Sequence, residues 1–255
     1  MKILLLDIEN APNLAHVWKF WKENVGVDQV VEDSYLLSFS CKWLEDTEVF
    51  YFDRSKYTER GLVNKLWVFL DQADIVIAHN GDRFDLTKIR SRMVYYDMDP
   101  PSPYKTIDTL KVARSQFNLE SNSLANLARY FKCKHQKKHH RKFPGFLLWK
   151  ETMKDNEEAW AEMKAYNIED ILVLEELYLK MRPWMTNHPN VAVYKDSEEP
   201  LCPHCGSKHL TRRGFSYTKV GKYQRFSCGD CGTWSQNRYT ENSKEVRKAL
   251  LKTAR

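Results

Sequence analysis

Residues 4–10, LLLDIEN, place two acids in a stretch that otherwise has the pattern of a buried strand. Side chains on a strand alternate between its two faces, so Asp7 and Glu9 project to the same side. Neighbouring carboxylates repel each other, and burying an unpaired carboxylate costs several kcal/mol. A metal ion between them would relieve both effects, so the pair favours a metal site. The alternative is that the strand ends near Leu6 and that both acids are solvated at its edge.

The rest of the first 183 residues has the pattern of an α/β domain. Residues 34–44 and 48–53 predict two further strands of an antiparallel meander, because β-branched and aromatic residues dominate them. Segments of helical period then alternate with short apolar strands, which predicts a sheet covered by helices. We expect strands at 74–80 and 104–109, and helices at 59–73, 82–98, 108–117, 123–131 and 156–182.

Partners for the first two acids come from two distant segments. Asp85, in AHNGDRFDL (78–86), follows a buried strand and a glycine turn, and such strand ends are where α/β sheets place their chemistry. Tyr166 and Asp170 are four residues apart and share one face of the last helix. Four acids predict a site for two Mg²⁺ ions, which prefer oxygen ligands and can activate water for an in-line phosphoryl displacement. The Tyr166 hydroxyl would orient that water without acting as the base.

The segments DIE, HNGDRFD and YNIED resemble the three motifs of the DnaQ-like 3′–5′ exonucleases, in the DEDD group with the tyrosine variant of the third motif. The resemblance covers residues 1–183 in the family's order. It implies an RNase H-like mixed sheet flanked by helices, with two Mg²⁺ or Mn²⁺ ions held by the four acids. Nucleotides would leave one at a time from a 3′ end, and the catalytic residues would be the four acids and Tyr166. Asn10 and Ala11 would lie near the terminal nucleotide.

Several other polar residues near these motifs have structural interpretations. Asp82 is expected to be a helix N-cap, and Asp108 a strand-end or cap acid. Glu169 points about 100° away from Asp170 on the helix, so we expect it to be solvated. Asn80 is expected to be a turn residue and is also a candidate contact with the substrate.

A basic stretch separates the second and third motifs. Residues 132–150 carry seven Lys or Arg and no acid, and we expect an exposed loop. Such charge runs are usually solvated, but this position between the motifs favours contact with a polyanionic substrate. The candidate phosphate contacts are Lys137, Lys138 and Arg141.

Two cysteine pairs near the C-terminal end predict a structural metal site. CPHCG (202–206) and CGDCG (228–232) each place a glycine after the second cysteine, where a tight turn is needed. Four thiolates predict a closed tetrahedral Zn²⁺ site, and the 22-residue spacer is long enough for a β-hairpin around Gly221. We therefore expect a zinc ribbon, which is similar to those of some transposases and phage proteins. Its ligands would be Cys202, Cys205, Cys228 and Cys231.

The net charge of +6 is distributed unevenly. From Pro200 onward there are 12 Lys or Arg against 3 acids, while the preceding residues carry 28 against 31. A basic terminal module predicts a polyanion partner, with a solubility tail as the alternative. Basic and aromatic residues alternate in the ribbon, as phosphate contact and base stacking require, although the rings could simply form its small core. The candidate nucleic-acid contacts are Arg212, Arg213, Lys222 and Arg225.

The expected organisation is an exonuclease domain at 1–185, a linker at 186–200, the zinc ribbon at 201–240 and a basic helical tail at 241–255. The expected function is a metal-dependent 3′–5′ exonuclease acting on single-stranded DNA, with a replication or recombination protein as a further partner. A 3′–5′ exoribonuclease, an enzyme that cuts internally, and a non-catalytic nucleic-acid-binding accessory protein remain open. The sequence has no 18-residue apolar run and no signal peptide, so we expect a cytoplasmic protein that does not contact membranes.

Overall fold

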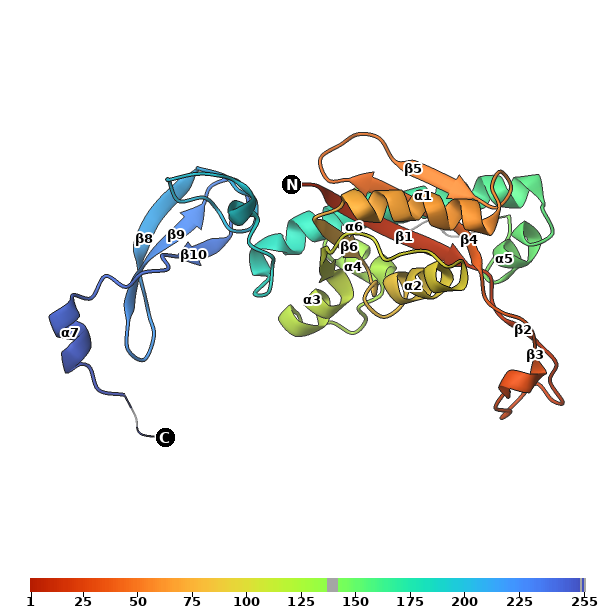
Figure 1. Ribbon diagram of the computed structural model, residues 1–255, viewed down its shortest axis with the longest axis horizontal. Coiled ribbons are helices and arrows are strands. Elements are labelled where there is room, and N and C mark those ends of the chain that lie inside the picture. Colours follow the sequence, from red (N-terminus) through yellow and green to blue (C-terminus); the bar gives the residue numbers. More distant parts are fainter. Residues whose placement is uncertain (137–141, 253, 255) are drawn as a thin grey trace. The chain divides into compact units, whose positions relative to one another are not determined.

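The computed structural model describes residues 1–136, 142–252 and 254. It forms two compact units, Lys2–Tyr178 and Leu179–Arg255, with Met1 grouped with the second (Figure 1). None of the described helices is long and apolar enough to cross a bilayer.

A five-stranded mixed sheet forms the centre of the first unit. Strands β1 (Ile3–Asn10), β4 (Leu36–Trp43) and β5 (Phe50–Asp53) are antiparallel neighbours. Strands β6 (Ile75–Ala78) and β7 (Lys105–Asp108) continue the sheet parallel to β1, so the order is β5-β4-β1-β6-β7. This arrangement confirms the predicted α/β fold with a mixed sheet.

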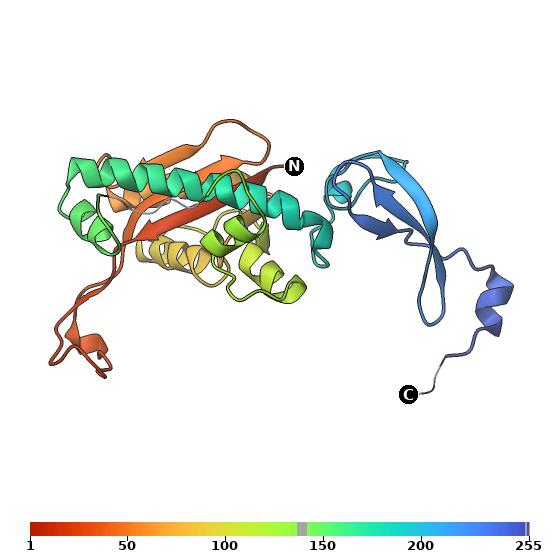
Figure 2. The ribbon, with the colours of Figure 1, turned by 180° about the vertical axis from the view of Figure 1, so that it is seen from behind.

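Helices cover both faces of this sheet. One apolar cluster joins the even-numbered β1 residues Leu4, Leu6 and Ile8 to the helices that Figure 1 shows in front of the sheet, α1 and α2. Figure 2 shows α6 crossing the opposite face. The odd-numbered side chains of β1, which include both acids, therefore project toward α6. The helices are α1 (Glu59–Gln72), α2 (Asp85–Tyr95), α3 (Thr109–Gln116), α4 (Leu124–Tyr130), α5 (Leu147–Thr152) and α6 (Glu157–Met181).

The turn after β6 determines where α2 begins. A Cβ atom on Gly81 would lie 2.3 Å from the Cβ of Ala78, so a larger residue does not fit there. Asn80 has a φ of 66°, in the left-handed region that asparagine tolerates, and its N–H donates to Asp108 Oδ1 over 2.9 Å. As a result the helix starts later than expected, at Asp85.

The caps of α2 and α3 test two of the sequence interpretations. The Asp82 carboxylate does not cap a helix but accepts from Lys111 Nζ over 2.6 Å, so the N-cap prediction is wrong. Asp108 is the N-cap of α3, where its carboxylate accepts from the N–H of Leu110 and of Lys111, as predicted.

Two segments of the first unit differ from expectation. The stretch 132–150 is not exposed throughout, because Phe143 and Leu148 are buried against Trp160 and Met163 and α5 begins inside it. Residues between β1 and β4 form an arm that the sequence pattern did not indicate. Its strands are β2 (Leu14–Ala15) and β3 (Val30–Glu32), and β4 begins at Leu36.

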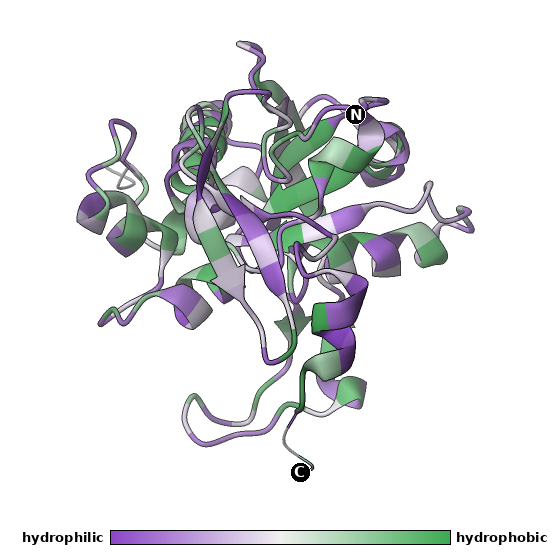
Figure 3. Ribbon diagram, turned by 90° about the vertical axis from the view of Figure 1, so that its left-hand side faces the viewer, coloured by the Kyte–Doolittle hydropathy of each residue, from purple (hydrophilic) through white to green (hydrophobic). Residues whose placement is uncertain are grey.

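The second unit contains a three-stranded antiparallel sheet. Its strands are β8 (Leu210–Tyr217), β9 (Lys222–Cys228) and β10 (Trp234–Gln236), in the order β10-β9-β8. The predicted hairpin around Gly221 is present, with Thr218 N–H donating to the Gly221 carbonyl. These strands are largely purple and pale in Figure 3, whereas the central strands of the first unit are mostly green. The ribbon therefore has little apolar core of its own.

The chain that precedes the ribbon packs against it. Val191 is buried and donates its N–H to the Pro203 carbonyl over 2.8 Å. The ring of His188 stacks on that of His204 at 4.4 Å, and burial lowers the pKa of both imidazoles, so neutral rings are stacked. After the ribbon, the short helix α7 (Lys244–Ala249) forms part of the basic tail.

Candidate active site and metal centre

Three of the acids singled out in the sequence converge in the first unit. One carboxylate oxygen each from Asp7, Glu9 and Asp170 lies within 4.8 Å of the other two. Strand alternation places the first two on the α6 side of β1, and α6 brings Asp170, which is 2% exposed. We call these three residues the acid cluster.

Asn167, one helical turn before Asp170, holds the first acid in place. Its Nδ2 donates to Asp7 Oδ2 over 2.5 Å, and its Oδ1 accepts from Ser38 Oγ over 3.3 Å. Ser38 lies opposite Glu9 in the β1–β4 register, and both Ser38 and Asn167 are completely buried. The sequence analysis missed this pair, although a polar residue on the buried face of α6 was a visible signal.

Trp149, in α5, orients the second acid. Its indole Nε1–H donates to Glu9 Oε2 over 3.1 Å, and its ring meets Tyr166 edge-on with the centroids 6.2 Å apart. The sequence analysis missed this tryptophan too, because it treated the end of the basic stretch as loop.

Tyr166 is 8% exposed and lies beside the acid cluster. Burial, followed by the charges of Asp170, Glu9 and Asp7, raises the pKa of its hydroxyl far above the ordinary value, and the hydroxyl hydrogen-bonds with Asp170. In the metal-free protein Tyr166 is therefore a protonated donor at neutral pH.

Asp85 is not a member of the acid cluster in this geometry. Its Oδ1 accepts from the Ile8 N–H over 3.1 Å, so it braces the backbone between Asp7 and Glu9. The residue is 3% exposed, and this burial raises the pKa of its carboxyl to about 7.

We expect Asp85→Asn to stabilise the metal-free protein in a pH-dependent way. The raised pKa means that between about pH 4 and 7 the folded chain keeps a proton that the unfolded chain releases. The free energy of unfolding therefore falls as pH rises through this window, by at most about 4 kcal/mol. Asparagine cannot ionise and retains the acceptor for Ile8. In urea unfolding with chelator, the free energy of unfolding of the variant relative to that of the wild type should increase from pH 4.5 to 8. If this difference stays constant with pH, the raised pKa of Asp85 is contradicted.

A second prediction concerns Asn167→Ala. The substitution removes the donor from Asn167 Nδ2 to Asp7 Oδ2 and so holds that carboxylate less firmly, and the Mg²⁺ concentration for half-maximal hydrolysis should rise about 10- to 100-fold. The KM for a short oligonucleotide should change little, because Asn167 is fully buried. Asn126→Ala, on the exposed side of α4, is the control. An unchanged Mg²⁺ dependence would mean that Asn167 does not position Asp7.

The donor set of the acid cluster fits a divalent cation. All three ligand atoms are carboxylate oxygens, which hard cations such as Mg²⁺ prefer, and two oxygens on one such ion lie up to about 4.2 Å apart. The three oxygen atoms lie within 4.8 Å of one another, so they are near enough to share such an ion.

A pocket of about 540 Å³ adjoins the acid cluster through Trp149. Its volume lies in the usual range for small-ligand sites. The Nδ2 of Asn10 is buried and has no hydrogen-bond partner among the residues that the structure describes. The pocket is lined by Asn10, Ala11, Pro12, Asn13, Ser34, Phe84, Lys88, Phe146 and Trp149.

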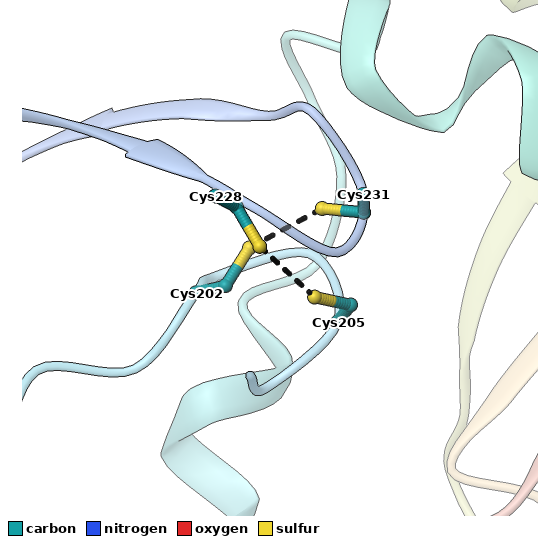
Figure 4. Close-up of side chains that lie close together, drawn as sticks. All are labelled: Cys202, Cys205, Cys228 and Cys231. Atoms are coloured by element: carbon teal, nitrogen blue, oxygen red, sulfur yellow. Dashed lines mark hydrogen bonds between the residues drawn. The ribbon is translucent and has the colours of Figure 1, made fainter. Parts of the chain in front are cut away.

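The four cysteines of the ribbon also converge (Figure 4). All four sulfur atoms lie within 4.8 Å, with the Sγ atoms of Cys202 and Cys231 3.5 Å apart and those of Cys205 and Cys228 3.6 Å apart. A tetrahedral zinc with bonds of about 2.3 Å requires sulfur–sulfur distances of about 3.8 Å, so this set fits Zn²⁺. Glycines 206 and 232 have φ of 69° and 77°, as the tight turns require.

The ribbon's basic candidates contact its aromatic rings. Lys222 Nζ lies 3.9 Å from the centre of the Phe215 ring, and the Arg225 guanidinium lies 4.7 Å from that of Trp234. Arg212 and Arg213 are exposed on β8.

The remaining candidates lie elsewhere. Asn80 occupies the turn after β6, where its backbone binds Asp108. Glu169 is not solvated, because its carboxylate lies 3.1 Å from His135 Nδ1 and its side chain is 13% exposed. Lys137, Lys138 and Arg141 lie outside the described residues.

Comparison with known proteins identifies the family. A sequence model of the RNase H superfamily matches residues 23–182, which is more than half of the chain. The chain belongs to the RNase H superfamily. The match includes Asp85, Tyr166 and Asp170 and begins after β1. The first unit is thus an RNase H-like nuclease domain, and the resemblance noted in the motifs is confirmed at this level.

Among solved structures, the chain is similar to the family B DNA polymerase from the hyperthermophilic archaeon Pyrobaculum calidifontis. The TM-score is 0.50 and the sequence identity 13%, with 71% of this chain and 25% of the polymerase covered. This chain therefore spans about a quarter of the polymerase's length, and the likeness concerns the fold. No curated protein matches the chain.

Proposed function

We propose that the protein is a metal-dependent 3′–5′ exonuclease that removes nucleotides from the 3′ ends of single-stranded DNA. The observation that carries the proposal is the convergence of Asp7, Glu9 and Asp170 beside a pocket of about 540 Å³. A terminal nucleotide in the pocket would place its phosphodiester next to the carboxylates.

Each side chain has a role in this proposal. The acid cluster, joined by Asp85, which lies outside it in the metal-free geometry, would hold two Mg²⁺ or Mn²⁺ ions, and these would supply the activation of water and the neutralisation of phosphate charge. The Tyr166 hydroxyl, which hydrogen-bonds with Asp170 in the metal-free geometry, would turn to the attacking water and orient it. Asn167 and Trp149 fix the orientation of Asp7 and Glu9.

The pocket would recognise the terminal nucleotide. Phe84 and Phe146 are partly exposed at its edge and offer faces for a base, while Lys88 offers a cation for a phosphate. The buried Nδ2 of Asn10 is a donor for a sugar or base oxygen.

The ribbon would bind the rest of the strand. Zn²⁺ held by its four cysteines fixes the module, and its exposed arginines and lysines contact phosphates. Tyr217, 72% exposed, offers a ring for an unpaired base. Unpaired bases are the reason for preferring a single strand.

The experiment that tests the proposal uses 5′-labelled single-stranded DNA and RNA of one sequence, incubated with the full chain and Mg²⁺. The proposal predicts a ladder of DNA products that shortens from the 3′ end and disappears in chelator. Faster shortening of RNA would instead assign an exoribonuclease. Binding of both strands without cleavage would favour the accessory-protein alternative.

A further inference from the structure

The arm between β1 and β4 exposes aromatic rings at its tip. Trp18, Phe20 and Trp21 are 93%, 92% and 83% exposed. Figures 1 and 2 both show strands β2 and β3 extending away from the five-stranded sheet. Three neighbouring large rings in water are an unfavourable surface unless something binds them.

Hydrogen bonds give the tip of the arm a defined backbone conformation. Both carboxylate oxygens of Glu23 accept from the backbone, from Trp18 N–H over 3.1 Å and from Lys19 N–H over 2.7 Å. The Gln29 amide donates to the His16 carbonyl and to Glu23, which ties the two sides of the arm together. These bonds fix the backbone that carries the rings.

The composition of the tip favours nucleic acid as the occupant. The run VWKFWK (17–22) alternates rings with Lys19 and Lys22, and the acid that follows it, Glu23, is hydrogen-bonded to the backbone of the run. Aromatic faces stack on any unpaired base, and lysines meet the phosphates between them. A protein partner would match the rings but not the lysines between them, because protein–protein interfaces are enriched in aromatic residues and depleted in lysine.

The arm begins at the edge of the pocket beside the acid cluster. Pro12 and Asn13 line that pocket, and β2 starts at the next residue, Leu14. Trp18 is five residues beyond Asn13, so it lies at most about 17 Å away. At about 3.4 Å per nucleotide, the spacing of one strand in a duplex, that distance spans about five nucleotides, and it spans fewer when the strand is more extended.

We infer that the arm stacks on unpaired bases within about five nucleotides of the 3′ end that the pocket binds. This inference rests on the proposed function. The rings would hold the strand in line with the acid cluster while successive terminal nucleotides are removed.

The test compares two triple variants of the full chain. Trp18→Ala with Phe20→Ala and Trp21→Ala removes the rings, whereas Trp18→Phe with Phe20→Tyr and Trp21→Phe retains them. All three positions are exposed, so neither set disturbs the core. We expect the alanine set to raise the Kd for an 8-nucleotide single-stranded DNA at least tenfold in chelator, and the ring-retaining set to stay within threefold. With Mg²⁺, the alanine set should lower kcat/KM on the 8-mer and leave dinucleotide cleavage unchanged.

Three results would overturn the inference. One is an unchanged Kd in the alanine set. Another is an equal loss on the dinucleotide and the 8-mer. A dimer that the alanine set dissociates would assign the rings to self-association and would equally overturn it. The binding assay does not depend on cleavage, so it separates the two claims. If the chain cleaves no substrate but its binding to single-stranded DNA depends on the rings, the binding role of the arm is supported and the proposed exonuclease activity is rejected.

Discussion

Asp7→Asn is expected to slow hydrolysis of single-stranded DNA about a thousandfold. The substitution removes one of the three carboxylates that lie within 4.8 Å of each other and keeps the shape of the side chain. Asparagine still offers an oxygen to Asn167 Nδ2, so the local hydrogen bond survives. A loss of about 4 kcal/mol of transition-state stabilisation corresponds to a thousandfold in rate, and a divalent cation site supplies several kcal/mol.

The same variant should unfold at a higher temperature than the wild type when both are free of metal, since one of three crowded negative charges is gone. Asp82→Asn is the matched control, because this acid belongs to the second motif and is bound to Lys111 in the structure. The control should keep its activity within about twofold. More than a tenth of wild-type activity in Asp7→Asn would contradict the role given to the acid cluster.

The second large effect is expected for Cys205→Ser. The structure buries one large apolar side chain in the ribbon sheet, Phe226, which is worth about 2–3 kcal/mol. Structural zinc contributes on the order of 10 kcal/mol in modules of this kind. Loss of one thiolate should therefore release zinc and unfold residues 202–236. Hydrogen exchange of the ribbon amides, together with zinc analysis, measures both effects.

Cys41→Ala, in β4 of the nuclease domain, is the control and should retain one zinc ion. On substrates, Cys205→Ser should still cleave dinucleotides at the wild-type rate and lose activity on long strands, because the ribbon is proposed to bind the strand and not the reacting end. Full exchange protection with no zinc bound would contradict the predicted metal centre. Equal losses on all lengths would mean that the nuclease domain depends on the ribbon for its own folding.

The sequence predicted those features that depend on local spacing. Alternation along LLLDIEN placed Asp7 and Glu9 on one face of β1, and the helical period placed Tyr166 and Asp170 on one face of α6. In the structure these two faces meet, and the acid cluster forms between them. The spacing within each CxxC pair places its two thiolates on one tight turn, so the convergence of four sulfur atoms could be predicted from the sequence. The sheet followed from apolar strands alternating with helices.

Features that depend on long-range contacts were not predicted. Asn167 binds an acid 160 residues away and Trp149 one 140 residues away, and neither contact has a sequence period. The arm was missed because strands of two and three residues are too short to show alternation. Asp82 was misread because the glycine turn delays the start of α2, which no cap pattern reveals.

The most direct test of the central claim compares linear and circular single-stranded DNA of one sequence, incubated with the full chain and Mg²⁺. A site that accepts a 3′ terminal nucleotide beside the acid cluster should release mononucleotides from the linear strand, should be blocked by a 3′ phosphate, and should leave the circle intact. Cutting of the circle, or release that begins at the 5′ end, would contradict the account.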